Sequence, residues 1–319
     1  MTEGFVTVNG VATHVITWGG WVEDQLNADH KEIVLLITGN PGLAGYYTTF
    51  LTRLHSRLGI PVWAVSLAGH VLPPLTSPYS LPSLRKNPEL YNLQGQVEHK
   101  LAFIEKFVPE NVKIILIGHS IGAKMILEVL KNSDIRSRVI KGYLLFPTIE
   151  RMAESPNGKL MTGVVKHIVP VILFLVWIFT FLPVLLKKIL LSLHFILRRI
   201  PTYHVAPTMK LMNPTVLGSV MFLALDEMDK VKGLDVESLR DVSDLLILYY
   251  GTTDGWVPLE YWKDMAQNHP EVKCMVCEKR IDHAFVLRYS NEMADILSDL
   301  IQEHQYYKVP REPGVSILG

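Results

Sequence analysis

The sequence predicts an α/β fold in which helices cover both faces of a mostly parallel β-sheet. Short apolar runs alternate with helical or longer segments, and this spacing is typical of buried parallel strands. At the N-terminus, FVTV and VATHVITW flank Asn9-Gly10, a dipeptide that favours the type I′ turn of a β-hairpin. The apolar runs are KEIVLLIT (31–38), PVWAVSLAG (61–69), VKIILIG (112–118), IKGYLLFP (140–147), DLLILYYG (244–251) and EVKCMVCE (271–278), with a helical stretch at 93–108.

Length and composition fit one elaborated domain over residues 1–319, because a chain of this size can bury a large core. The 31 basic and 31 acidic residues balance, so no bulk field favours nucleic acid as a partner. The start, MTEGFVTVNG, lacks a basic stretch before an apolar core, and we expect no secretory signal. The two cysteines, Cys274 and Cys277, indicate core packing in a reducing, cytosol-facing setting.

The segment Gly118-His119-Ser120-Ile121-Gly122 matches the G-x-S-x-G motif. It directly follows the expected strand IILI and precedes a helical run, AKMILEVLK. A nucleophile elbow requires this strand–turn–helix context, because the glycines permit a strained turn that exposes the serine hydroxyl at the sheet edge. We therefore expect the α/β-hydrolase fold with Ser120 as nucleophile. The alternative is a structural serine at a helix start.

A serine hydroxyl needs a base to remove its proton and an acid to orient that base. In this fold the acid and the histidine follow the serine along the chain in that order. Asp254 comes just after the strand LLILYY, and His283 follows the next strand on a loop before a helical run. We expect both in the triad; the alternatives are a turn aspartate beside Gly255 and a helix-cap histidine. Outside the triad we place His70, His119, Asp226, Asp229, Asp235 and Asp282.

Acyl transfer also needs hydrogen-bond donors for the developing oxyanion. We expect one to be the backbone amide of Ile121, the residue after the nucleophile. The second should come from the loop after the first long strand, Thr38-Gly39-Asn40-Pro41-Gly42. Because proline has no amide hydrogen, the backbone of Asn40 is the expected donor. The alternative is an ordinary turn.

With these motifs the chain resembles the family of lipid droplet-associated hydrolases. The resemblance implies the triad Ser120, Asp254 and His283. It also implies residence on lipid droplets and the endoplasmic reticulum, with neutral lipid or sterol esters as substrates. The matching stretches run from about residue 33 to 300 and are ITGNPG, AGH (68–70), LQGQVEHKLAF, IGHSIG, LLFPTIERMAESPNG, YYGTTDGWVP and EKRIDHAF.

The interval 148–240 is too long for a loop between neighbouring strands, so we expect an inserted cap over the active site. Its apolar segment, 164–200, contains the uncharged run IVPVILFLVWIFTFLPVLL (168–186). By length this run is a candidate for a transmembrane helix. A single crossing, however, would separate the serine of the triad from the aspartate and histidine that follow the insert.

A bent insertion at a lipid surface therefore fits better than a span. Pro170 and Pro183 favour bends, and KKILLSLHFILRRI (187–200) predicts a basic amphipathic helix in the interface. The alternative is a cap helix buried against the enzyme.

These features together predict an esterase or lipase that acts on an apolar ester at a lipid surface. Ser120 attacks the ester carbonyl, His283 takes and returns the proton, and Asp254 orients the imidazole. The mechanism needs no metal or organic cofactor. Two alternatives remain: an acyltransferase with the same triad, and a lipid-droplet adaptor that keeps the hydrolase fold as a scaffold.

Overall fold

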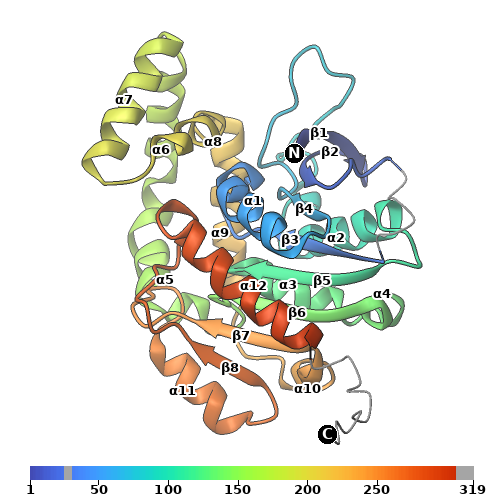
Figure 1. Cartoon of the computed structure of the whole chain (residues 1–319). Coiled ribbons are helices and arrows are strands. Elements are labelled where there is room, and N and C mark those ends of the chain that lie inside the picture. Colours follow the sequence, from blue (N-terminus) through green and yellow to red (C-terminus); the bar gives the residue numbers. More distant parts are fainter. Residues whose placement is uncertain (25–30, 307–319) are drawn as a thin grey trace, which may run out of the picture.

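The computed structural model describes residues 1–24 and 31–306, and its centre is an eight-stranded sheet (Figure 1). The strand order is β1-β2-β4-β3-β5-β6-β7-β8. The pairs β1–β2 and β2–β4 are antiparallel, and all later neighbours are parallel. The predicted α/β-hydrolase fold is confirmed, and each apolar run holds one parallel strand. The strands are β1 Thr2–Val8, β2 Val11–Trp18, β3 Glu32–Ile37, β4 Val62–Val65, β5 Lys113–His119, β6 Val139–Leu145, β7 Leu246–Tyr250 and β8 Lys273–Val276.

The N-terminal hairpin forms where the dipeptide predicts it. Asn9 and Gly10 both have positive φ, 47° and 72°, which a type I′ turn requires. The β1–β2 register runs from Val8 opposite Val11 to Thr2 opposite Thr17. Because β2 also pairs with β4, the hairpin extends the parallel sheet by two antiparallel strands.

Helices cover both faces of the sheet because alternate strand residues point to opposite sides. On β3, Ile33, Leu35 and Ile37 pack with α2, α3 and α11, whereas Val34 and Leu36 pack with α1 and α12. Helix α2 corresponds to the helix predicted over 93–108. The bounds are α1 Thr48–Leu58, α2 Leu93–Phe107, α3 Ile121–Val129, α4 Ser133–Arg138, α11 Leu259–Asn268 and α12 Ser290–Tyr306.

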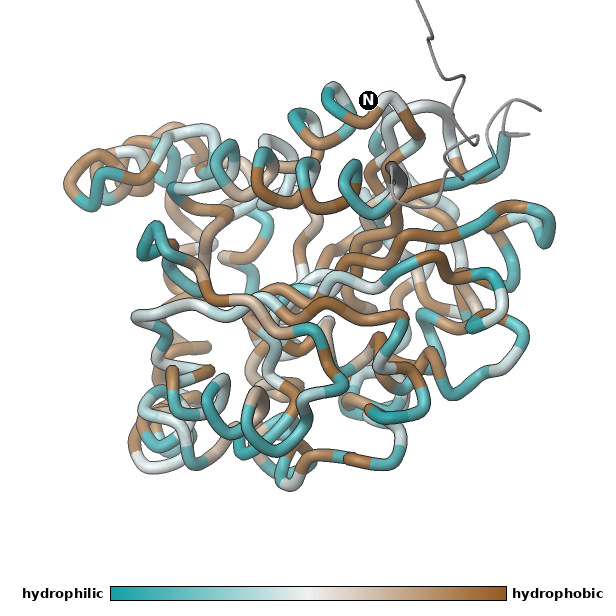
Figure 2. Tube along the Cα trace, turned by 60° about the horizontal axis from the view of Figure 1, so that its bottom comes forward, coloured by the Kyte–Doolittle hydropathy of each residue, from teal (hydrophilic) through white to brown (hydrophobic). Residues whose placement is uncertain are grey.

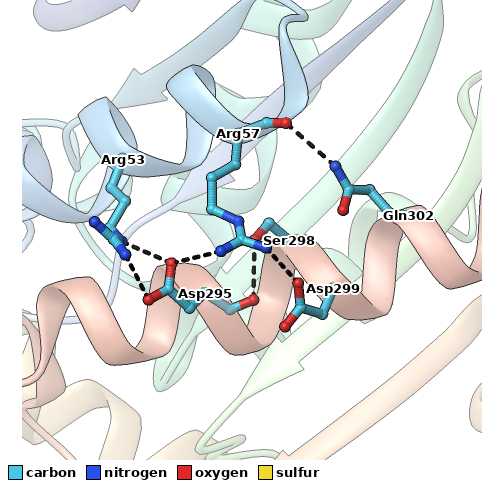
Figure 3. A network of polar contacts seen from close by, with 6 residues as sticks. All are labelled: Arg53, Arg57, Asp295, Ser298, Asp299 and Gln302. Carbon is cyan, nitrogen blue, oxygen red and sulfur yellow. Dashed lines mark hydrogen bonds and ion pairs between the residues drawn. The ribbon is translucent and has the colours of Figure 1, made fainter.

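A charged network joins α1 to α12, the helix that follows His283 (Figure 3). Arg53 makes a bidentate pair with Asp295 at 2.6 and 2.7 Å, and Arg57 contacts both Asp295 and Asp299. Because these side chains are partly exposed, solvent screens their attraction. The apolar contacts beneath them hold the helices together, and the ion pairs fix how one helix lies along the other.

Between β6 and β7, the helices from α5 to α9 gather at one end of the sheet, whereas α10 lies apart from them, shortly before β7 (Figure 1). A short turn over residues 181–183 joins α6 to α7, and the two project from the body as a pair, here called the α6–α7 pair. Pro183 precedes α7, whereas Pro170 lies inside α6 without ending it. The elements are α5 Pro156–Leu160, a π-helical turn Met161–Val165, α6 Lys166–Thr180, α7 Val184–Leu197, α8 Val205–Leu211, α9 Pro214–Lys230 and α10 Val236–Arg240.

The α6–α7 pair presents apolar side chains to its surroundings. Trp177 is 49 % exposed, Phe181 69 % and Leu197 74 %. Hydrophobic residues run along this projecting pair much as they run along the central strands (Figure 2). Within α6 and α7 only Val176 and Phe195 are buried. The pair is therefore not the buried cap helix of the alternative.

Length and composition alone would allow the continuous helical run Pro156–Thr180 to cross a membrane. Only 6 % of its most apolar window is buried. In α7, Lys187 and Ser192 lie partly against the protein, and most of the apolar residues face outward, whereas Leu191 and Phe195 face inward. The polar side of this predicted amphipathic helix, which includes Lys187 and Ser192, therefore faces partly inward, toward the body of the molecule.

Candidate active site

Ser120 lies in the sharp turn between β5 and α3, as the motif predicts. Its backbone angles, φ 54° and ψ −123°, are strained for a residue with a side chain. A Cβ on Gly122 would approach the Ile37 carbonyl oxygen to 2.3 Å, and one on Gly118 would lie 2.7 Å from the Ile126 side chain. Both motif glycines are thus needed because the turn is tightly packed.

The structure brings the three predicted triad residues together. His283 Nε2 lies 2.9 Å from Ser120 Oγ, and His283 Nδ1 lies 2.6 Å from Asp254 Oδ2. Because an ionised carboxylate can only accept, Nδ1 donates, and Nε2 is left to accept the serine proton. The arrangement matches the roles of nucleophile, base and orienting acid.

Asp254 is held rigidly in its loop. Its side chain is buried, and Oδ1 accepts from the backbone amides of Trp256 at 2.7 Å and Val257 at 3.1 Å. Asp254 is therefore both a turn aspartate, as in the alternative interpretation, and the partner of His283. Its Oδ1 accepts from the backbone of the turn, and its Oδ2 accepts from the histidine.

A hydrogen-bonded chain that the sequence did not predict runs behind the triad. The Gly39 amide donates to Tyr47 Oη at 3.0 Å, Tyr47 Oη lies 2.6 Å from His119 Nδ1, and His119 Nε2 lies 2.9 Å from the His283 carbonyl oxygen. Since a carbonyl only accepts, His119 Nε2 carries the proton.

His119 is neutral, which fixes the direction of the remaining bond. Burial, and next the nearby His283, lower the pKa of His119 to about 3. With Nε2 protonated, Nδ1 accepts, and the Tyr47 hydroxyl therefore donates to it. The chain links the loop after β3 to the backbone of the candidate base. No pattern in the sequence marks Tyr47, and His119 occupies the variable position of the motif.

The loop after β3 passes directly over the nucleophile. A Cβ on Gly39 would lie 2.8 Å from Ser120 Cβ, so the loop backbone is pressed against the serine. Asn40 donates from its side chain to the Val220 carbonyl on α9 at 3.0 Å. Asn40 follows Gly39 directly, and Ile121 follows the serine as the first residue of α3. Both expected amide donors thus belong to segments that adjoin the hydroxyl.

Ser120 and His283 line a cavity of about 630 Å³ whose wall is mostly apolar. The inner side of α7 contributes Leu191 and Phe195, so the exposed α6–α7 pair also forms part of this wall. Tyr46 lines it as well, and its hydroxyl bonds to Thr208 at 2.8 Å. A long apolar group is the ligand that such a cavity suits.

The remaining acidic and histidine candidates have other partners. His70 Nδ1 donates to the Pro41 carbonyl at 2.8 Å, and burial lowers its pKa to about 4. Asp282 pairs with Arg288 at 3.2 Å near the surface. Among the described residues, no group of three or more His, Cys, Asp or Glu side chains could hold a metal ion. The remaining partners are Leu93 for Asp226, Lys230 and Lys232 for Asp229, and Lys131 and Ser238 for Asp235.

Comparison with known proteins shows which family this chain is similar to. The model of the family described as lipid-droplet associated hydrolase matches residues 30–286. The lipid droplet-associated hydrolase of Drosophila melanogaster is 48 % identical over 307 residues, covering 96 % of this chain and 99 % of the fly protein. The proteins of the same name from Gallus gallus and Homo sapiens are 37 % and 35 % identical, each covering 94 % of this chain and 95 % of the relative.

Solved structures support the fold. An esterase from Exiguobacterium antarcticum superposes with a TM-score of 0.63 at 14 % identity, covering 94 % of this chain and all of the esterase. A thermophilic esterase from Thermogutta terrifontis gives 0.60 at 14 % identity, covering 95 % and 99 %. At this level of identity the likeness concerns the fold alone.

Proposed function

The chain belongs to the family of lipid droplet-associated hydrolases, and we propose that it is a serine hydrolase that cleaves carboxylic esters of neutral lipids, sterol esters among them. The observation that carries the proposal is the line of hydrogen bonds from Ser120 through His283 to Asp254. The apolar cavity beside the serine supports an apolar substrate.

The reaction follows from the positions of these groups. Ser120 Oγ attacks the ester carbonyl while His283 Nε2 takes the hydroxyl proton, and Asp254 stabilises the imidazolium that forms. The backbone amides of Ile121 and Asn40 donate to the oxyanion. Collapse of the tetrahedral intermediate breaks the ester C–O bond, and His283 returns the proton to the leaving alcohol. Water, activated by the same histidine, then releases the acid from the acyl-enzyme.

We also propose that residues 148–240 form a cap within one hydrolase domain over 1–319, and that the α6–α7 pair docks this cap on lipid. The exposed apolar side chains of the pair suit insertion into one leaflet or into the monolayer of a droplet. Lys188 in α7 and Arg198 and Arg199 just after it are exposed and would meet anionic headgroups. The expected location is the cytosolic face of lipid droplets and the endoplasmic reticulum.

A fluorophosphonate probe tests the catalytic proposal, because it reacts with an activated serine. The wild type should be labelled and Ser120→Ala should not, whereas Ser133→Ala, at an exposed helix start, should label like the wild type. Hydrolysis of emulsified triacylglycerols and sterol esters then tests the substrate class. A folded wild type that takes up no probe would favour the adaptor, and ester products formed with an added alcohol would favour the acyltransferase.

A further inference from the structure

A carboxyl group that the triad does not use lines the cavity. Glu227, in the last two turns of α9, is only 2 % exposed and shares the cavity wall with Ser120 and His283. Among the described residues, its Oε1 atom has no hydrogen-bond partner. Burying a carboxyl group without a cationic partner costs free energy, so we expect this group to make a specific polar contact.

Glu227 is a neutral acid at neutral pH. Burial raises its pKa to about 8, a hydrogen bond with the Asn40 side chain opposes the shift, and the nearby charge of Asp226 adds to it. A protonated carboxyl group can donate as well as accept. An ionised one could only accept.

Glu227 shares the cavity wall with Asn40, the residue expected to complete the oxyanion hole, and the Asn40 side chain lowers the pKa of its carboxyl group against the effect of burial. The Asn40 amide nitrogen also donates to the Val220 carbonyl, two helical turns earlier on the same side of α9. The Asn40 oxygen, Oδ1, is buried and has no partner of its own within the described part of the chain. A carboxylic acid and a carboxamide are complementary, since each offers one donor and one acceptor to the other.

We propose that Glu227 is a positioning residue that holds the Asn40 side chain as an acid–amide pair and thereby fixes the Asn40 backbone amide beside Ser120. This inference rests on the proposed function, because it requires that amide to stabilise the oxyanion. Donors of this kind accelerate a reaction only when they are already in place before charge develops.

The other parts of the loop have their own supports, which leaves this task to α9. Gly39 is held by the Tyr47 hydroxyl, and Pro41 by His70. Asn40 lies between them and reaches α9 through its side chain. The same helix packs through Val220 against Val176 of α6. Helix α9, which anchors Asn40, therefore also packs against the α6–α7 pair.

Two substitutions of Glu227 separate positioning from a purely structural role. Glu227→Gln keeps a neutral group that can pair with an amide, whereas Glu227→Leu fills the space without polar atoms. With soluble p-nitrophenyl butyrate, Glu227→Leu should lower kcat about 10- to 100-fold with little change in KM, because a misplaced donor costs less than the 10²- to 10³-fold loss on removal. Glu227→Gln should stay within about threefold of the wild type. Met228→Leu, buried on α9 outside the cavity wall, is the packing control.

A double-mutant cycle tests whether Glu227 acts through Asn40. Asn40→Ala keeps the backbone amide but removes its anchor, so it should lower kcat about as much as Glu227→Leu. The two together should cost no more than either alone. Wild-type kcat in Glu227→Leu, or losses that multiply in the double variant, would overturn the proposal.

Hydrogen–deuterium exchange of the peptide 38–44 gives a readout that needs no activity. The loop amides should exchange faster in Glu227→Leu than in the wild type and Glu227→Gln, while exchange in β5 stays unchanged. If the wild type hydrolyses no ester and takes up no fluorophosphonate, the proposed function fails. In that case hydrogen–deuterium exchange still tests whether Glu227 fixes the loop. Equal exchange rates of the loop amides in the wild type, Glu227→Gln and Glu227→Leu would contradict that role.

Discussion

The Nε2 atom of His119 donates to the backbone carbonyl of His283 at 2.9 Å, so the residue before the nucleophile is bonded to the main chain of the candidate base. The two histidines are 164 positions apart in sequence. Their bond fixes the loop that carries the imidazole, in addition to the bonds that the imidazole itself makes. Tyr47 extends the same connection to Gly39.

Removing the Tyr47 hydroxyl tests this connection. Tyr47→Phe leaves the Gly39 amide and His119 Nδ1 unpaired in a buried place, which should lower the free energy of unfolding by about 1–3 kcal/mol. The freed loop should lower kcat about tenfold with a small change in KM. Thermal unfolding and p-nitrophenyl butyrate kinetics measure the two effects. Tyr143→Phe is the control, because that buried hydroxyl bonds to the Leu300 carbonyl outside the cavity wall, and it should keep the wild-type kcat.

Asp254→Asn should lower kcat about 10⁴-fold, because an amide no longer selects the tautomer of His283 that accepts the serine proton. The backbone amides of Trp256 and Val257 can still donate to the side-chain oxygen, so the fold should persist. Circular dichroism and ester hydrolysis measure both. Asp282→Asn, beside the triad histidine, should keep the wild-type rate. A rate in Asp254→Asn above a tenth of the wild type would remove this residue from the triad.

Gly39→Ala should slow labelling by fluorophosphonate strongly and destabilise the fold. Its Cβ would lie 2.8 Å from Ser120 Cβ and 2.9 Å from the His119 carbonyl oxygen, so the loop must move away from the serine. Gly218→Ala is the matched control, because open space surrounds that position in α9. It should label normally and raise the free energy of unfolding by about 0.5–1 kcal/mol. Equal labelling of both variants would show that the loop is not needed beside the serine.

Charges on the α6–α7 pair should weaken binding to lipid without impairing the triad. Trp177→Glu with Phe181→Glu places two carboxylates where the indole and phenyl rings are largely exposed and in contact, with centroids 4.8 Å apart. Flotation with artificial droplets should show less bound protein, while hydrolysis of p-nitrophenyl butyrate stays unchanged. Leu75→Glu, an exposed apolar residue outside the pair, should bind like the wild type. Undiminished flotation of the double variant would contradict the docking proposal.

Glu227 should make the stability of the wild type fall as pH rises from about 4.5 to about 8. Over this range the unfolded chain has lost the carboxyl proton, whereas the folded protein, whose Glu227 pKa is about 8, retains it. Folding therefore takes up a proton, and each pH unit costs up to about 1.4 kcal/mol. The difference in free energy of unfolding between Glu227→Gln and the wild type should grow across this window and then level off. Urea unfolding at pH 5, 6, 7 and 8 measures it, and a constant difference would show that Glu227 is already ionised.

The sequence predicted the sheet and the three residues of the candidate triad that the structure brings together, because both follow from local patterns. Strand-length apolar runs, the strand–turn–helix context of Ser120 and the order of Asp254 and His283 are visible along the chain. The supports of the site are not, because they depend on tertiary contacts. His119 meets the His283 carbonyl and Glu227 meets Asn40 only after distant segments pack, and no spacing in the sequence marks either contact.

The orientation of α7 was only partly predictable for a similar reason. The helical periodicity of its sequence separates polar from apolar residues, but it does not determine which side of the helix packs against the protein. Phe195 lies on the same side of the helix as Lys187 and Ser192. Because Phe195 packs inward, part of the polar side of α7 faces the body of the protein. Most apolar side chains of α7 are therefore exposed.

Helix α7 has two apolar sides with different surroundings, one on the cavity through Leu191 and Phe195 and the other exposed through Leu193 and Leu197. A detergent that coats the outer side therefore contacts the same helix that lines the cavity. Rates measured in micelles will report on the amphiphile as well as on the enzyme, and the choice of detergent becomes an experimental variable. Assays at several detergent-to-protein ratios, with surface area rather than bulk concentration as the reference, keep the two contributions apart.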